Sequence, residues 1–170
     1  MKYYSTKNKK ITANFRTAVI NGIAEDGGLF MPEEIPQFPA GMMQSLPNQS
    51  LHEIGMQVIS KFAGYMDQLS LLKIIEQAIN FNAPVKTLSE SLSILELFHG
   101  PTLAFKDFGA RFLANAMAHF NKDEDKELII LVATSGDTGS AVASSFYGKE
   151  GIKVGLLYPC LLYTSPSPRD

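Results

Sequence analysis

Three nearly continuous apolar runs in the second half of the chain constrain its fold more than any other feature. They span residues 92–98, 128–133 and 152–158. Two stretches with helical patterning, residues 107–120 and 138–147, lie between them. Continuous apolar strands that alternate with helices are typical of βαβ units, in which helices cover both faces of a parallel sheet. The second half of the chain is therefore predicted to begin an α/β fold with a parallel sheet.

The first half of the chain has a different pattern, with two amphipathic helices as its clearest feature. The first is predicted over residues 51–62, because apolar residues recur there at helical spacing and Ser50 and Glu53 form a capping box. The second is predicted over residues 68–81. Its apolar face is expected to contain Leu72, Ile75 and Ile79. Core packing, rather than chemistry, is the expected role of both helices.

These patterns divide the chain into three regions. Residues 1–83 are predicted to form a helical N-terminal region, and residues 84–159 the beginning of the parallel-sheet domain. Residues 160–170 read Cys-Leu-Leu-Tyr-Thr-Ser-Pro-Ser-Pro-Arg-Asp. This tail resembles the translation of an adaptor used in DNA sequencing libraries, so we expect it not to be native; a natural Pro/Ser-rich tail is the alternative. Without the tail the chain has no cysteine, and neither disulfide nor thiol chemistry is expected.

Charge and hydropathy argue against several classes of function. The formal net charge is −2 at pH 7, which gives no electrostatic signal for nucleic-acid binding. A basic patch near the start contains Lys2, Lys7, Lys9 and Lys10, but no apolar run follows it, so a secretory signal is not expected. No stretch has the length and composition of a membrane span. The cytoplasm is therefore the expected compartment.

The first of two unusual loops covers residues 99–107, with the sequence His-Gly-Pro-Thr-Leu-Ala-Phe-Lys-Asp. Asp107 is predicted to be the N-cap of the helix that follows. Lys106 would then lie between Phe105 and Phe108, close to a helix start. Partial desolvation and the positive end of a helix both disfavour an ammonium ion, and an easily deprotonated lysine is what Schiff-base chemistry requires. A surface lysine whose stem covers apolar side chains is the alternative interpretation.

The second loop, residues 133–140, reads Ala-Thr-Ser-Gly-Asp-Thr-Gly-Ser and lies between a buried strand and a helix of small residues. Backbone N–H groups at a helix start, together with the hydroxyls of Thr134, Ser135 and Thr138, could hold a carboxylate or a phosphate. An ordinary turn capped by Asp137 or Thr138 explains the loop equally well. Because ligands of open parallel sheets bind beyond the carboxyl ends of the strands, the two loops are expected side by side at one site.

Three segments, taken together, resemble threonine synthases. Residues 96–109, Glu-Leu-Phe-His-Gly-Pro-Thr-Leu-Ala-Phe-Lys-Asp-Phe-Gly, are similar to the segment that contains the cofactor lysine of that family. Residues 133–139 resemble its second signature. The opening is similar as well, with Tyr-Tyr-Ser-Thr at residues 3–6 and Gly-Gly-Leu-Phe-Met-Pro at residues 27–32. The resemblance extends from the start of the chain to about Pro159.

The resemblance implies a fold type II enzyme that depends on pyridoxal 5'-phosphate (PLP), with the architecture of the tryptophan synthase β chain. The implied reaction, the last step of threonine biosynthesis, converts O-phospho-L-homoserine and water into L-threonine and phosphate, so the enzyme would be a carbon–oxygen lyase acting on phosphates. Lys106 would be the catalytic residue, joined to PLP as a Schiff base and moving protons on the substrate. Phe105 and Asp137 would also contact the cofactor. Five loop residues would surround the substrate's anionic groups: Thr134, Ser135, Gly136, Asp137 and Thr138.

The resemblance also limits what this chain can do alone. Threonine synthases are more than twice as long, and residues 160–170 stand where a basic segment would continue. The loop for the PLP phosphate and the partner of the pyridine nitrogen would therefore be missing, and the chain as written is expected to be inactive. The alternatives are a threonine synthase-like protein that binds without catalysis, another fold type II lyase or dehydratase, and an ATP- or phosphosugar-binding enzyme. Neither nucleic acid, nor a membrane, nor a metal ion is an expected partner.

Overall fold

The computed structural model describes residues 1–134 and 136–158. Ser135 and the expected non-native tail, residues 160–170, lie outside the described residues. The chain divides into two compact units, the first from Met1 to Ile79 and the second from Asn80 onwards.

The first unit begins with a small antiparallel sheet in the order β2–β1–β3. β1 (Tyr3–Ser5) pairs with β2 (Thr12–Ala13) on one side and with β3 (Phe30–Pro32) on the other. Helix α1 (Phe15–Asn21) follows β2 and ends at Gly22, whose φ of 67° lies in the left-handed region that favours glycine.

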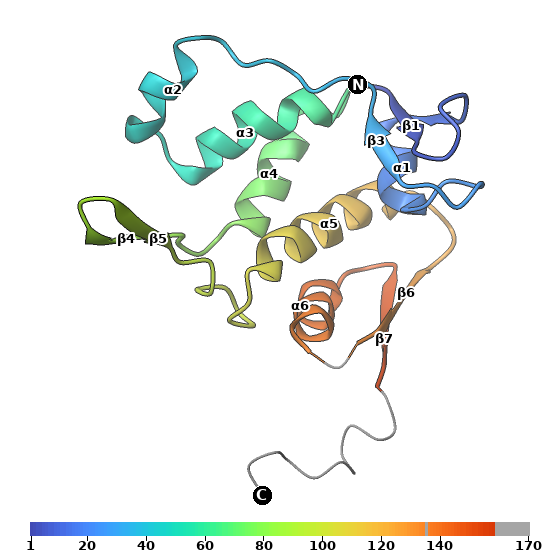
Figure 1. Cartoon of the computed structure of the whole chain (residues 1–170). Helices are drawn as coiled ribbons and strands as arrows, with labels where there is room; N and C mark the ends of the chain where they lie inside the picture. Colours follow the sequence, from blue (N-terminus) through green and yellow to red (C-terminus); the bar gives the residue numbers. More distant parts are fainter. Residues whose placement is uncertain (135, 159–170) are drawn as a thin grey trace, which may run out of the picture. The chain divides into compact units, whose positions relative to one another are not determined.

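Both helices predicted in the first half are present (Figure 1). α3 (Leu51–Phe62) begins with the predicted capping box, in which the Ser50 hydroxyl accepts from the N–H of Glu53 and the Glu53 carboxylate accepts from the N–H of Ser50. α4 (Gln68–Ala78) ends earlier than predicted. The predicted apolar face was partly wrong, because Leu72 is only partly buried. The buried residues of α4 are Leu71, Ile74, Ile75 and Ala78.

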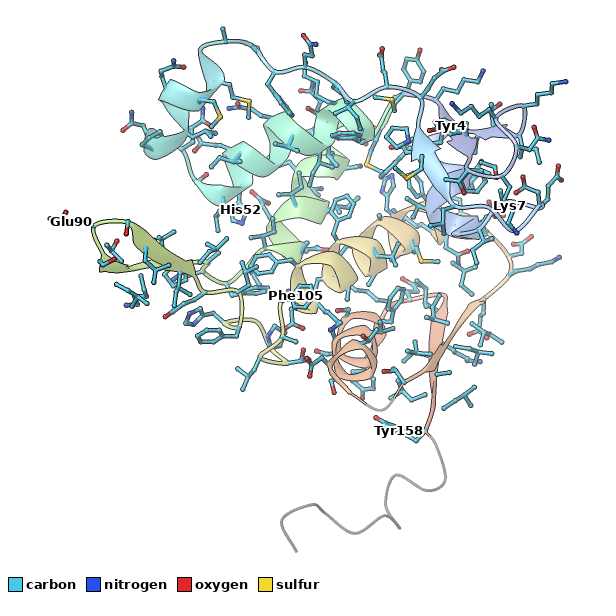
Figure 2. The ribbon with its side chains drawn as sticks, viewed as in Figure 1. Tyr4, Lys7, His52, Glu90, Phe105 and Tyr158 are labelled. Atoms are coloured by element: carbon cyan, nitrogen blue, oxygen red, sulfur yellow. The ribbon has the colours of Figure 1, made fainter. Side chains whose placement is uncertain are left out.

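Close packing joins α3 to α4. A Cβ atom on Gly55 would lie 3.1 Å from Cγ2 of Ile75, so the glycine lets the two helices approach closely. The ring of His52, labelled in Figure 2, donates from Nε2 to the carbonyl oxygen of Ile79 across 2.6 Å. A short helix α2 (Met42–Ser45) and a 3₁₀ turn η1 (Leu46–Asn48) precede this pair. The packing of α3 against α4 is thus as predicted, whereas the small antiparallel sheet was not predicted.

The second unit contains the predicted βαβ arrangement. β6 (Leu128–Ala133) and β7 (Ile152–Leu157) are parallel and pair in register from end to end, and α6 (Asp137–Phe146) connects them. The long helix α5 (Lys106–Asn121) precedes β6 and packs against α6. Figure 1 shows α6 beside the β6–β7 pair. The two strands and two helices confirm the prediction of an α/β fold with a parallel sheet.

The apolar run at residues 92–98 was wrongly predicted to be a third parallel strand. It forms β5 (Leu92–Leu95), which pairs antiparallel with β4 (Val85–Ser89) in a hairpin. The turn contains Glu90, which Figure 2 labels at the hairpin tip. Every residue of both strands is exposed to solvent. A two-residue turn pairs β5 with the strand that precedes it in the chain, and this pairing satisfies the hydrogen-bonding groups of its backbone. An apolar run alone does not show whether a strand will pair in a local hairpin or in a parallel sheet.

One face of the parallel pair lacks the predicted cover. In β6, half-buried residues alternate with exposed ones, and Ile129 and Leu131 are 66% and 67% exposed. Successive side chains of a strand point to opposite faces, so α6 covers one face while the other is open within the described residues. No helix in the described part of the chain has the length and apolarity needed to cross a membrane.

Candidate active site

The first turns of α5 and α6 bring the two unusual loops together. Nζ of Lys106, at the first residue of α5, lies 3.9 Å from Oδ2 of Asp137, at the first residue of α6. The side chain of Lys106 is 32% exposed and that of Asp137 is 72% exposed. Residues 31 positions apart in the chain therefore form one ion pair, so the two loops lie together as expected, although the first loop does not follow a strand of the parallel sheet.

An aromatic ring forms the second contact of the lysine. Nζ of Lys106 lies 4.6 Å from the centroid of the Phe105 ring, a cation–π distance. Phe105 is labelled in Figure 2 at the start of α5. Phe108 also lies in the first turn of α5, and its ring packs edge to face against the Phe81 ring, with 4.7 Å between the ring centroids. The amine thus lies between a carboxylate and aromatic surface.

Lys106 stands at the wall of an open hollow of about 580 Å³ between α5 and α6. The walls are almost entirely apolar, and Lys106 and Thr138 are the residues with polar side chains that line it. The apolar lining consists of Leu97, Phe105, Phe108, Gly109, Ala110, Leu113, Ala141 and Val142. A space of this kind suits a flat, largely apolar ring that carries a group reactive toward an amine.

The lysine loop is held in a way that the sequence did not predict. Asp107 was predicted to be the N-cap of α5, and this was wrong: the helix begins at Lys106, and Asp107 lies inside the first turn. Its fully buried carboxylate accepts hydrogen bonds from the backbone N–H of Thr102 across 2.9 Å and from the Thr102 hydroxyl across 2.7 Å. N-cap preference is a local rule, and here a contact five residues back in the chain replaces it.

The plain-turn alternative for the second loop requires Asp137 or Thr138 to be the N-cap of α6, and neither residue is. Gly136 occupies the N-cap position of α6 with no side-chain hydrogen bond, and neither Asp137 nor Thr138 caps the helix. Thr134 directly follows β6; its N–H donates to the carbonyl of Leu157, and its hydroxyl accepts from the N–H of Gly136 across 3.4 Å. Among the described residues, therefore, neither Asp137 nor Thr138 accepts the backbone donors of the first turn of α6 as an N-cap.

Gly139 sets how closely α6 approaches the end of β6. A Cβ atom at this position would lie 2.8 Å from Cγ2 of Thr134, closer than real side chains pack. The glycine therefore fixes the start of α6, and with it Asp137 and Thr138, against the strand end. Thr138 then lines the hollow beside Lys106. The predicted residues Thr134 and Gly136 lie at the same helix start but do not line the hollow.

Sequence reasoning missed a polar link between α5 and the turn after α6. Nζ of Lys149 donates to Oδ1 of the buried Asn115 across 2.5 Å. Burial, and then the positive charge of Arg111, lower the pKa of Lys149. Asn115 in turn donates to the carbonyl of Arg111. This link holds α5 in place relative to the segment that leads into β7. It could not be predicted from the sequence, because the two residues are 34 positions apart and belong to no local motif.

Comparison with known proteins gives one consistent result. A family model described as the threonine synthase N terminus matches residues 2–79. Threonine synthases from Haemophilus influenzae and Escherichia coli are 43% and 41% identical over 160 residues, and the match covers 94% of this chain. The threonine synthase of Schizosaccharomyces pombe is 38% identical over 172 residues. The chain spans 37% of the length of the two bacterial relatives.

Solved structures agree with the sequence matches. The threonine synthase of Escherichia coli superposes with a TM-score of 0.86 at 40% identity, covering 94% of this chain and 37% of that one. A PLP-bound threonine synthase from Brucella melitensis superposes with a TM-score of 0.88 at 34% identity, covering 94% of this chain and 36% of that one. The fold described above is therefore that of the corresponding third of these enzymes.

Proposed function

We propose that this chain, which spans a little over a third of the length of the threonine synthases that it matches, is part of an enzyme of that family that makes threonine. The proposed reaction converts O-phospho-L-homoserine and water into L-threonine and phosphate, with PLP as cofactor. The observation that carries the proposal is the position of Lys106, whose amine lies at the wall of an apolar hollow and 3.9 Å from Asp137.

The residues present fit PLP. The hollow of about 580 Å³ is apolar and partly aromatic, which suits a pyridine ring, and a lysine amine at its wall is the group that binds an aldehyde covalently. PLP, when bound, supplies an electron sink for the substrate carbons. We propose that Phe105 packs against the cofactor and that Lys106 holds it and moves protons on the substrate.

We assign Asp137 first to the lysine. Its carboxylate already faces the Lys106 amine across 3.9 Å, where it can orient the lysine side chain. The backbone donors at the start of α6, with Thr134, Ser135, Gly136 and Thr138, are proposed to receive the anionic groups of the substrate, because a helix start attracts negative charge. The carboxylate of Asp137 would then limit how closely a phosphate approaches the lysine.

The substrate class is tested by giving the full-length enzyme two substrates. With PLP present, O-phospho-L-homoserine should yield L-threonine and inorganic phosphate in equal amounts, while L-homoserine should yield no threonine. Threonine from L-homoserine at a comparable rate would identify a lyase that does not need the phosphate, and release of a 2-oxo acid and ammonia in place of threonine would identify a dehydratase. Binding of O-phospho-L-homoserine without turnover would support a non-catalytic member instead. We further propose that the enzyme acts in the cytoplasm, which fractionation of cells would check.

A further inference from the structure

We infer that Asp107 is a positioning residue that, together with Thr102, sets the direction of Lys106. The inference rests on the proposed function, in which Lys106 holds the cofactor. It concerns a different question, namely what fixes the backbone from which the lysine extends. The pair Asp107 and Thr102 is called the loop clasp below.

The burial of Asp107 is the first observation. It is among the largest fully buried side chains of the described residues, and it carries an ionisable group. Burying a carboxylate is costly unless hydrogen bonds compensate for the lost water. The two hydrogen bonds from Thr102 provide this compensation, and the position in the first turn of α5 adds the positive end of the helix dipole. Because the buried Asp107 carboxylate depends on these two hydrogen bonds, it fixes the position of Thr102 relative to the first turn of α5.

The shape of the loop is the second observation. A Cβ atom on Gly100 would overlap the Asp107 side chain, lying 2.7 Å from its Cβ, so the loop passes directly over the carboxylate. Leu103, between Thr102 and the lysine, has φ of 58° and is the one non-glycine residue of the described chain in the left-handed region. Such a conformation is strained and persists where surrounding contacts impose it. The loop clasp is the contact that spans Leu103.

The place of Lys106 in this loop links the clasp to chemistry. Residues 102 and 107 are fixed to each other, and Lys106 lies between them on the last part of the closed loop. The lysine side chain itself has only weak restraints, the 3.9 Å ion pair and the ring of Phe105. If the clasp opens, Leu103 can relax, and the backbone before Lys106 turns with it. The amine would then leave its position between Asp137 and the hollow.

The test uses the full-length enzyme with paired variants. Thr102→Val removes one donor and keeps the size, Asp107→Asn keeps the shape and removes the charge, and the double variant tests whether the two act as a unit. Thr102→Ser keeps the hydroxyl and serves as the rescue variant. Asp123→Asn, at an exposed site beyond the end of α5, is the control for a lost carboxylate elsewhere.

The first readout is the rate at which added PLP becomes covalently attached to Lys106, measured by borohydride reduction at timed intervals and peptide mapping. Thr102→Val and Asp107→Asn should each slow attachment about tenfold or more, because displacement of a reacting group by about 1 Å can cost on the order of a hundredfold. The double variant should be no slower than about twice the slower single variant, as expected for residues that act through one contact. Thr102→Ser and Asp123→Asn should match the parent.

The second readout needs no cofactor and separates this inference from the proposed function. In the PLP-free enzyme, acetic anhydride should acetylate Lys106 faster in both single variants, relative to the exposed Lys153, because the amine has left Asp137 and Phe105. A parent labelled by PLP at another lysine, with this acetylation change still present, would reject the proposed function alone. Folded variants with parent rates in both assays would show that Asp107 serves stability only, and additive losses in the double variant would show that Thr102 and Asp107 do not act through one contact. If Asp107→Asn does not fold, the Thr102→Val and Thr102→Ser pair decides the matter by itself.

Discussion

Lys106 has two neighbours, the Asp137 carboxylate at 3.9 Å and the face of the Phe105 ring. A lysine that must bind an aldehyde and then move protons has no substitute in this segment of the chain. In the full-length enzyme, Lys106→Ala should lower threonine formation by at least about 10²-fold, the contribution typical of a general acid–base group. The melting temperature should change little, since the side chain is partly exposed. Activity within about tenfold of the parent would remove Lys106 from the mechanism.

Substitutions at Asp137 and Thr138 test whether the second loop serves substrate binding or only folding. Neither side chain caps α6, so Asp137→Asn and Thr138→Val should leave the melting temperature within a few degrees of the parent. Turnover with O-phospho-L-homoserine should fall about tenfold or more, because both residues border the site of Lys106. Calorimetry and kinetics on the same samples check this. A lower melting temperature with unchanged kinetics would return the loop to the plain-turn interpretation.

Asp26 gives a prediction about pH in the first unit. The hydroxyl of Ser5 and then the N–H of Gly28 donate to its carboxylate, and they lower the pKa of Asp26 below its usual value. A lowered folded-state pKa means that the carboxylate stabilises the fold above its unfolded-state pKa and loses this effect as the pH falls through the folded-state pKa. Asp26→Asn should therefore lower the melting temperature at pH 7, and this effect should shrink progressively as the pH falls below the usual pKa of an aspartate. An equal loss at every pH would contradict this.

At the scale of elements, strong local signals predicted most of the structure. Ser50 and Glu53 formed the predicted capping box, and the runs at 128–133 and 152–158 formed the parallel pair. The run at 92–98 failed because apolar content alone does not choose between a local hairpin and a distant parallel partner. The prediction that Asp107 is an N-cap was wrong because the local preference was overridden. Its side chain instead forms a tertiary contact with Thr102.

Gly139 tests whether the approach of α6 to β6 matters for the site. A Cβ atom there would lie 2.8 Å from Cγ2 of Thr134, so Gly139→Ala must displace the start of α6 and with it Asp137. The expected cost is about 1–3 kcal/mol of stability, together with slower covalent attachment of PLP to Lys106. For stability, measured by melting of the PLP-free enzyme because Gly109 lines the hollow, the matched control is Gly109→Ala in α5, where a Cβ atom meets nothing within 4 Å. That change should stabilise the enzyme by about 0.5–1 kcal/mol, so opposite signs from the same substitution separate crowding from helix propensity.

At the scale of the whole molecule, the open face of the parallel pair decides what residues 1–170 can do alone. Ile129 and Leu131 are 66% and 67% exposed on this face, and the strands of a parallel sheet are ordinarily covered on both sides. The relatives are far longer than this chain, which spans 37% of their length. We therefore expect the 170-residue chain to melt without cooperativity, to retain little PLP and to make no threonine, because an uncovered apolar strand face promotes association.

A double substitution on the open face of the parallel pair tests this last prediction. Changing Ile129 and Leu131 to Thr removes apolar surface from the open face and places a β-branched side chain, which suits a strand, at both positions. In residues 1–170 the double variant should reduce aggregation, measured by light scattering during heating, because these side chains face solvent there. In the full-length enzyme the same variant should lower the melting temperature, because burying a hydroxyl where an apolar side chain packed costs about 1–3 kcal/mol. If the variant were neutral in the full-length enzyme, or if residues 1–170 melted cooperatively with bound PLP and threonine production, the open face would be a native surface, and the rest of the enzyme would not be needed to cover it.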